Sequence, residues 1–219
     1  MSDKPEIFLF DMDHTMIDND CDVSWKQFAV AEGLAPREDL DEAERFFKLY
    51  EEGRLPIDDF LLFQLREFSG RTINEMKEWA VQHFEKVVKK RIYKDAVKAV
   101  EAAKKKGVVA ILSATNSVLC SPLAEYLGIE HVESTELEIV DGVFTGKLAA
   151  EYRCGEGKVP AAEKFCAAHG VKMADAAYYG DSYSDRFVLS AVGFPYAVNP
   201  HFRLREIAEK NNWPILNWE

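Results

Sequence analysis

Long apolar runs and paired cysteines are both missing from this 219-residue sequence. No segment approaches the roughly 20 apolar residues of a membrane-spanning helix, and the first residues show no pattern of a cleaved signal. The four cysteines lie far apart and form no CxxC pair, which argues against a disulfide framework or a zinc knuckle. We therefore expect a cytoplasmic protein that does not interact with a membrane.

Basic residues are fewer than acidic ones: the chain has 27 Lys and Arg against 38 Asp and Glu, which gives a net charge of −11. Binding of DNA or RNA depends on clustered basic side chains, so we expect no nucleic-acid partner. An anionic substrate would need positive charge inside its own site. Since 47% of the residues are hydrophobic, the chain can bury the core of one domain, or of one domain with a large insertion.

Short apolar runs alternate with segments of helical periodicity along much of the chain. The runs predict buried strands at 6–11, 108–113, 175–181 and 193–198. The periodic segments predict helices at 93–106, 117–127, 157–169, 183–190 and 200–211. Residues 134–148 alternate and turn at Asp141-Gly142, which predicts a hairpin. Strands that alternate with helices predict an α/β fold with a doubly wound, parallel, Rossmann-like sheet.

Residues 21–90 contain no strand pattern. Their apolar positions recur every three or four residues, and Gly and Pro interrupt this periodicity, which predicts three or four helices. The block separates the first predicted strand from all the others. We therefore expect an α/β core domain made of residues 1–16 and 92–219, with an inserted helical cap domain of residues 17–91.

Polar residues follow several predicted strands, and ligands of such sheets bind beyond the carboxyl ends of the strands. The first group is Asp11-Met12-Asp13, at the end of the first strand. Asp11 can attack phosphorus and form an acyl phosphate. Asp13 can protonate the leaving oxygen and later deprotonate a water molecule. The alternative is a chance pair of acidic residues in a loop.

Three later segments offer complementary groups. Ser113 ends the next predicted strand, where its hydroxyl can bind a phosphoryl oxygen or cap the following helix. Lys158 opens a helix, whose free amides favour an anion, unless it is an ordinary surface lysine. Asp181 ends another strand, and Asp185 follows about one helical turn later. Carboxylates suit Mg²⁺, so Asp181 can bind the metal and Asp185 can orient it; the alternative for Asp181 is a helix cap.

The combination of these motifs resembles a known family. The motifs are Asp11-x-Asp13-x-Thr15, Ser113, Lys158 and Gly180-Asp181-Ser182-x-x-Asp185. In this order they resemble the haloacid dehalogenase (HAD) superfamily, and within it subfamily IB, which contains the phosphoserine phosphatases. The helical insertion looks like the C1 cap of that subfamily. The resemblance extends over essentially the whole chain.

The resemblance implies a role for each matching residue. Asp11 would be the nucleophile, Asp13 the acid and base, and Ser113 with Lys158 the phosphate-binding pair. The implied Mg²⁺ ligands are Asp11, Asp13 through its backbone carbonyl, and Asp181. Asp185 would orient these ligands without binding the metal itself. We therefore predict a Mg²⁺-dependent phosphatase that hydrolyses a small phosphomonoester through an aspartyl-phosphate intermediate.

Two other functions remain open at this point. A phosphotransferase that passes the phosphoryl group to an alcohol shares the first half-reaction. A non-enzymatic phosphoacceptor or binding module also combines clustered Asp, hydroxyl and Lys residues on an α/β sheet. The presence of Asp13 and of the helical insertion favours the enzyme. Both a monomer and a homodimer are compatible with the sequence.

The substrate is less well defined. Phosphoserine phosphatases typically carry Glu nine residues after the nucleophile, where this chain has Asp20. Asp20 is a candidate for recognising the substrate, and its alternative is a helix cap. Phosphoserine, histidinol phosphate and phosphocholine-like esters all remain open. Further candidates in the predicted cap are Trp25, Arg45, Lys48, Arg54 and Arg66.

Overall fold

The computed structural model describes residues 4–219, apart from the side chain of Glu51. Its centre is a six-stranded parallel sheet with the strand order β3-β2-β1-β6-β7-β8. The strands are β1 (Ile7–Phe10), β2 (Val108–Asn116), β3 (His131–Thr135), β6 (Ala176–Gly180), β7 (Phe194–Val198) and β8 (Ile215–Leu216). Every residue of β1 is buried, because it lies between β2 and β6 with helices on both faces. The predicted parallel α/β fold is confirmed.

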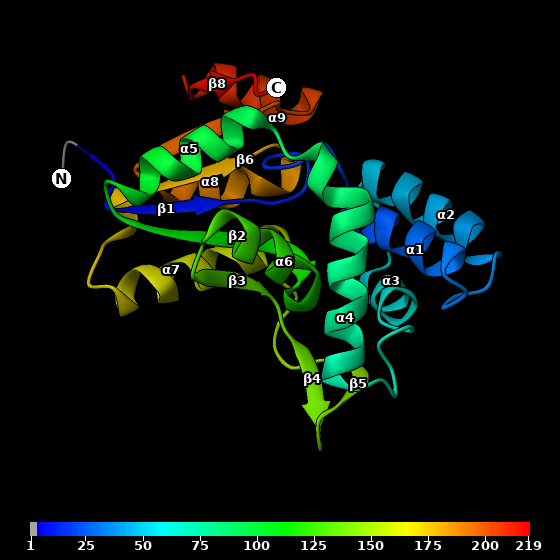
Figure 1. Ribbon diagram of the computed structural model, residues 1–219. Helices are drawn as coiled ribbons and strands as arrows, with labels where there is room; N and C mark the ends of the chain where they lie inside the picture. Colours follow the sequence, from blue (N-terminus) through cyan, green and yellow to red (C-terminus); the bar gives the residue numbers. More distant parts are fainter. Residues whose placement is uncertain (1–3) are drawn as a thin grey trace.

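Alternate residues of β1 face two different hydrophobic clusters. Phe8 and Phe10 pack with α5 (Lys94–Lys104) and α6 (Ser117–Leu127) on one face of the sheet. Ile7 and Leu9 pack on the other face with α7 (Lys158–Ala168), α8 (Arg186–Ala191) and α9 (Phe202–Lys210). The two-residue side-chain period of a strand thus distributes one apolar run between two cores. Figure 1 shows these helices around the sheet.

Four α-helices follow β1 in the chain and precede α5 and β2. They are α1 (Cys21–Ala31), α2 (Asp39–Glu51), α3 (Ile57–Gln64) and α4 (Ile73–His83), and a π-helical turn, Phe84–Val88, continues α4. Figure 1 shows them at the end of the sheet toward which β1 points. Trp25 lies in their core, with its ring centroid 5.6 Å from those of Phe28 and Phe68. We call residues 21–83 the helical insert; the domain boundaries expected near residues 17 and 91 stay a prediction.

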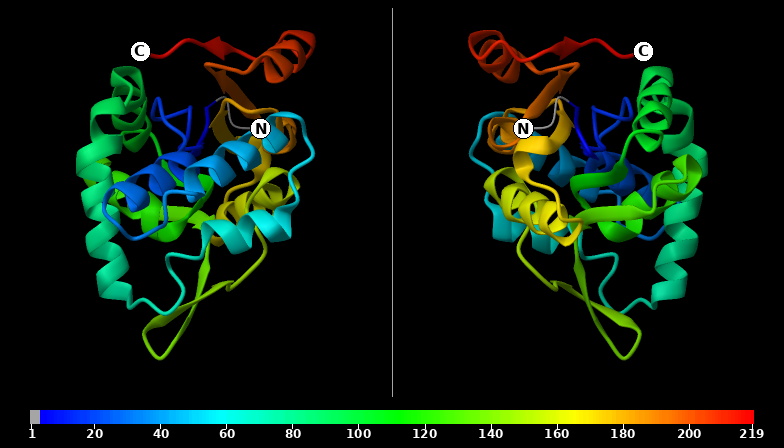
Figure 2. Two further views of the ribbon diagram at one scale, coloured as in Figure 1. Left: turned by 90° about the vertical axis from the view of Figure 1, so that its right-hand side faces the viewer. Right: turned by 90° about the vertical axis from the view of Figure 1, so that its left-hand side faces the viewer.

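A separate two-stranded hairpin extends from the main sheet. It consists of β4 (Leu137–Val140) and β5 (Val143–Leu148), and Asp141 and Gly142 at its turn have φ values of 51° and 79°. Its amide and carbonyl groups also pair with the insert, since the N–H of Gly70 donates to the carbonyl of Phe144 at 2.9 Å. Figure 2 shows the hairpin projecting beside the lower end of α4. The predicted hairpin is confirmed, although Ser134 and Thr135 belong to β3.

Two strands of the main sheet were not predicted. β3 has the sequence HVEST, in which polar residues interrupt the apolar pattern, and it lies at the edge of the sheet. β8 at the opposite edge has only two residues. Among the described residues, no helix combines the length and the apolar character that a bilayer crossing requires.

Candidate active site

The candidate site lies beyond the carboxyl ends of β1, β2 and β6. Asp11 follows β1 directly, and its backbone N–H donates to the carbonyl of Tyr179 at 2.9 Å, which holds the loop against β6. The N–H of Met12 donates to Asp11 Oδ1 at 2.8 Å. The side chain of Asp11 is buried, and its second oxygen faces a lysine from another part of the chain.

Lys158, the first residue of α7, provides that positive charge. Its Nζ lies 2.9 Å from Asp11 Oδ2 and 2.7 Å from Asp185 Oδ1, and it also donates to the hydroxyl of Tyr178 at 2.9 Å. Burial alone would lower the pKa of Lys158, but the neighbouring carboxylates of Asp11 and Asp185 hold it well above its usual value. The ammonium group therefore stays charged. Asp11 and Lys158, 147 positions apart in the sequence, meet at one point.

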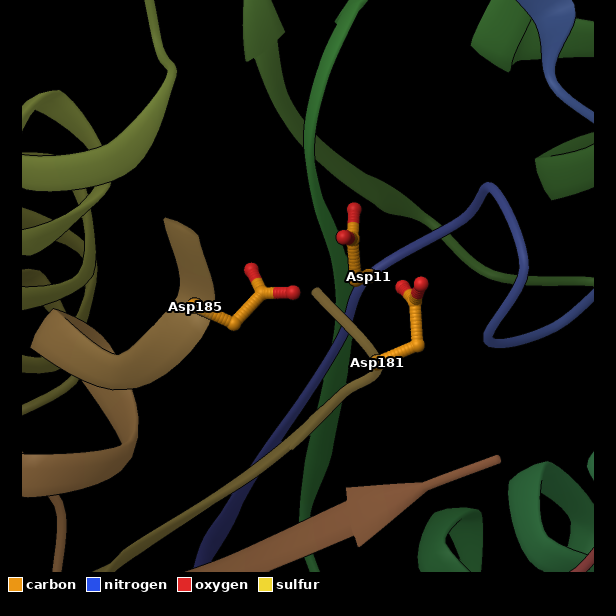
Figure 3. A group of neighbouring side chains, drawn as sticks. All are labelled: Asp11, Asp181 and Asp185. Atoms are coloured by element: carbon orange, nitrogen blue, oxygen red, sulfur yellow. The ribbon is translucent and has the colours of Figure 1, made fainter. Parts of the chain in front are cut away.

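Asp181 and Asp185 complete a cluster of carboxylates with Asp11. Single carboxylate oxygens from the three residues all lie within 4.8 Å of one another (Figure 3). A Cβ atom at Gly180 would lie only 2.8 Å from Asp185 Cγ, so glycine permits this close approach. The sequence prediction that these segments converge is consistent with this geometry.

The two C-terminal aspartates differ in their partners. Asp185 accepts hydrogen bonds from Lys158, from the Tyr178 hydroxyl at 2.6 Å and from the backbone N–H of Ser182 at 3.0 Å. Although burial opposes it, these donors, led by Lys158, lower the pKa of Asp185. Asp181 accepts from the Thr15 hydroxyl at 3.0 Å. Burial, followed by the charges of Asp185 and Asp11, raises the pKa of Asp181 well above its usual value.

The charge balance of this cluster fits a divalent cation. Three carboxylates face one ammonium group, and burial together with the Asp185 charge raises the pKa of Asp11 to about 6, even though Lys158 lies beside it. Carboxylate oxygens at this spacing are the hard donors that Mg²⁺ prefers. Asp11 and Asp181 therefore fit as ligands, whereas the hydrogen bonds of Asp185 suit a residue that positions Lys158 and the metal ligands.

Asp13 is held by two donors from different elements. Its Oδ1 accepts from the backbone N–H of Cys21 at 2.8 Å, and its Oδ2 accepts from the hydroxyl of Thr115 at 2.6 Å. Burial, followed by the charge of Asp20, raises its pKa to about 7. Such a carboxyl group can carry a proton near neutral pH and can also accept one, as an acid and base must.

Ser113 and Asp20 were each predicted with two alternative roles, substrate binding or helix capping. Ser113 lies inside β2 rather than at its end; it is buried, and its hydroxyl accepts from the N–H of Thr115 at 3.2 Å. The helix-capping alternative for Ser113 is wrong, because Asn116 caps α6. The capping alternative for Asp20 is confirmed, since its Oδ1 accepts from the N–H of Val23 at 2.9 Å. Its role toward a substrate stays a prediction.

The basic candidates in the insert all pair with nearby carboxylates. Arg45 lies 2.6 Å from Glu42, Lys48 lies 2.7 Å from Glu44, and Arg54 and Arg66 pair with Glu52 and Asp39. All four are exposed. A small cavity between the insert and the core is instead lined by residues that sequence reasoning missed: Asp22, Phe60, Leu61, Gln64, Leu65, Ala114, Asn116, Thr135 and Tyr152.

Sequence reasoning also missed Thr115 and Tyr178, because tertiary packing selects their partners. Thr115 and Tyr178 lie on strands β2 and β6. Tyr178 was predicted only as part of the buried strand 175–181, and Thr115 lies just after the predicted strand 108–113. Their hydroxyl groups are partners of Asp13 and Asp185, residues that lie on other elements. The sequence near Thr115 gives one indication of a role in the site, because its hydroxyl lies two residues beyond Ser113. The sequence near Tyr178 gives no such indication.

Comparison with known proteins agrees with this geometry. The structure defines an α/β protein whose buried carboxylates and Lys158 meet at the carboxyl ends of the central strands. The chain belongs to the haloacid dehalogenase-like hydrolase family, whose model matches residues 8–190. It is similar to a histidinol-phosphatase of Neisseria meningitidis serogroup C, with 29% identity over 217 residues, which cover 96% of this chain and 98% of the relative.

Two solved structures are also similar. A protein of unknown function from Bordetella pertussis Tohama I has a TM-score of 0.87 and 29% identity, and the match covers 97% of this chain and 98% of that one. A substrate-bound phosphoserine phosphatase has a TM-score of 0.72 at 20% identity, covering 98% and 94% of the two chains, and this likeness concerns the fold. The predicted family and the predicted enzyme class, a phosphoric monoester hydrolase, are confirmed.

Proposed function

We propose that the protein hydrolyses a small phosphomonoester with Mg²⁺ as cofactor and Asp11 as the covalent nucleophile. One observation carries the proposal: the carboxylate of Asp11 lies at the end of the central strand, 2.9 Å from the ammonium group of Lys158 and in one cluster with Asp181. A phosphoryl group that enters this cluster meets a nucleophile and a positive charge together.

The chemistry proceeds in two displacements at phosphorus. Asp11 attacks the phosphorus atom, the bond to the ester oxygen breaks, and Asp13 gives its proton to that oxygen as the alcohol leaves. Asp13, now ionised, takes a proton from water, and the oxygen of that water attacks phosphorus. The bond between phosphorus and Asp11 breaks, which regenerates the carboxylate and releases inorganic phosphate.

Other residues of the site position and stabilise the phosphoryl group. Lys158 balances its charge and reduces its repulsion from Asp11, and the Ser113 hydroxyl is proposed to donate to a phosphoryl oxygen. Mg²⁺ would be held by Asp11, Asp181 and the backbone carbonyl of Asp13, where it would neutralise charge on the phosphoryl oxygens. Asp185 keeps Lys158 in place through their 2.7 Å contact.

The size of the substrate follows from the insert. We propose that residues 17–91 act as a cap over the site, which favours a metabolite over a phosphorylated protein. The histidinol-phosphatase relative supports a small ester, because the similarity extends over nearly all of both chains. Transfer of the phosphoryl group to an alcohol uses the same first step, and product analysis with added alcohols distinguishes transfer from hydrolysis.

Replacement of Asp11 tests the proposal. In Asp11→Asn, Mg²⁺-dependent release of phosphate from 4-nitrophenyl phosphate should fall by about 10⁴-fold or more, because the covalent step is lost. The matched control is Asp18→Asn, an exposed residue of the same loop region, which should retain activity. Mass spectrometry of the acid-quenched wild type should find a phosphoryl group on the peptide that contains Asp11. Full turnover by Asp11→Asn would contradict the mechanism.

A further inference from the structure

Strand β2 is irregular near its carboxyl end, where it passes the candidate site. Leu112 pairs with Glu133 of β3, and Asn116 pairs with Thr135, so three residues of β2 correspond there to one residue of β3. A bulge of this kind redirects side chains, and bulges are frequent beside active sites. Here the bulge contains Thr115, whose hydroxyl reaches a residue of the loop after β1.

The bulge is held in place by side chains around it. The hydroxyl of Thr135 donates to the carbonyl of Ala114 at 2.6 Å, and the thiol of Cys120 donates to the carbonyl of Thr115 at 3.5 Å. The N–H of Thr115 donates to the hydroxyl of Ser113 at 3.2 Å. Backbone groups that leave the ladder of a sheet need such partners when they are buried. The position of the buried Thr115 is therefore fixed by the fold.

The residue that Thr115 reaches is Asp13, the proposed proton donor. The Thr115 hydroxyl donates to Asp13 Oδ2 at 2.6 Å, and the backbone N–H of Cys21 donates to Asp13 Oδ1 at 2.8 Å. One donor belongs to the core sheet and the other to the first residue of α1 in the insert. With one donor on each oxygen, the plane of the carboxyl group is fixed. A hydroxyl that donates to an ionised carboxylate has a short contact of this length.

These two donors act on the charge that forms during the first displacement. The bond between phosphorus and the ester oxygen breaks, its electron pair stays on that oxygen, and the proton of Asp13 moves to it. Asp13 thereby becomes a carboxylate, and hydrogen bonds to a group become stronger when it is charged. Loss of the proton is therefore easier with both donors in place. The Cys21 donor is a backbone amide, so Thr115 is the donor that a side-chain substitution can remove.

We propose that Thr115 is a positioning residue for the proton donor: it directs the carboxyl group of Asp13 and stabilises the carboxylate that remains when the proton leaves. The inference rests on the proposed roles of Asp11 and Asp13. Because Thr115 acts through Asp13, its effect should depend on the alcohol that leaves. A leaving group that is stable as an anion needs little help from an acid, whereas a weakly acidic alcohol needs the proton.

Three substituted phenyl phosphates test this dependence. They are 4-nitrophenyl, phenyl and 4-methoxyphenyl phosphate, which share one ring and one phosphate and differ in the acidity of the phenol. In Thr115→Val, which removes the hydroxyl and keeps the shape, kcat/KM for 4-nitrophenyl phosphate should stay within about threefold of the wild type. For the other two esters it should fall at least about tenfold further. A purely structural effect would lower all three values equally.

Two more variants complete the test. Thr115→Ser keeps the hydroxyl and should restore the wild-type dependence on the leaving group. Thr145→Val removes a hydroxyl that donates to the carboxylate of Glu138, also at 2.6 Å, on the distant hairpin, and should keep that dependence. Thermal unfolding identifies a variant that fails to fold, and Thr115→Ala then takes the place of Thr115→Val.

The outcomes distinguish the inference from the proposed function. Equal losses for all three esters without the Thr115 hydroxyl, or a Thr115→Ser variant that behaves like Thr115→Val, would overturn the inference. The same change of dependence in Thr145→Val would overturn it as well, because the effect would then not be specific to Asp13. If the wild type hydrolysed none of the three esters, the proposed function itself would be wrong.

Discussion

Two lysines are buried among the residues that the structure describes, and their surroundings differ in a way that distinguishes a candidate site from a structural cluster. Lys26 in the insert lies between Glu67 and the carbonyl of Phe63, and with Asp39 and Arg66 it forms a group of two cations and two carboxylates. Lys158 faces Asp11 and Asp185, with Asp181 nearby, so three carboxylates surround one cation.

The pKa shifts of the two lysines have opposite signs. Burial lowers the pKa of Lys26 despite its carboxylate partners, whereas the carboxylates around Lys158 raise its pKa well above the usual value. A balanced buried group fixes the packing of helices and leaves nothing for a ligand to neutralise. An excess of carboxylates at the end of a strand, in contrast, provides a place for a cation and a phosphoryl group.

Replacing each lysine with Met is the strongest test of this contrast. Lys158→Met should lower kcat/KM by about 10³-fold, because the phosphoryl charge loses its cation. Lys26→Met should instead lower the free energy of unfolding by about 3–5 kcal/mol, because Glu67 stays buried without its partner. Denaturant titration and turnover per folded molecule measure the two effects. If Lys26→Met destroyed turnover while stability stayed constant, the distinction would be wrong.

The two clusters should also respond differently to metal. Mg²⁺ at about 100 times its dissociation constant should stabilise the wild type by about 2.7 kcal/mol, since it binds only the folded chain. Asp181→Asn should lose this stabilisation, because a proposed ligand is removed. Glu67→Gln should lower Tm equally with and without Mg²⁺, because the Lys26 cluster does not bind the ion. Thermal unfolding in Mg²⁺ and in EDTA measures both; an equal Mg²⁺ shift in Asp181→Asn would contradict the metal site.

The sequence indicated the site around Lys158 but not the cluster around Lys26. The apolar run of β1 placed Asp11 at a strand end, and the position of Lys158 at the start of a helix indicated an anion site. Nothing local indicates that Lys26 is buried, because its partner Glu67 is 41 positions away. Partners such as Thr115 and Tyr178 were missed for the same reason, since tertiary packing selects them.

Asp22 lies on α1, one helical turn before Lys26, and it gives a pH-dependent test. Its pKa is about 8 in the folded protein against an ordinary value of 3.8. The folded state therefore favours the protonated form, and the associated stability is lost as pH rises from about 4 through about 8. At pH 9, Asp22→Asn should be more stable than the wild type by about 1–2 kcal/mol, and at pH 5 this gain in stability should be smaller. Denaturant titrations at both pH values decide; an equal difference at pH 5 and pH 9 would exclude the burial of charge as its cause.

The smallest effects should come from the exposed basic residues of the insert. Arg45 and Lys48 pair with Glu42 and Glu44 on α2, and the side chains of both basic residues are at least half exposed. Water screens such pairs, so Arg45→Ala and Lys48→Ala should leave Tm without a resolvable change and kcat/KM within about twofold of the wild type. Steady-state kinetics with 4-nitrophenyl phosphate and thermal unfolding provide the measurements. A loss of kcat/KM well beyond twofold in either variant, at unchanged Tm, would mean that these cations reach the substrate when the insert moves.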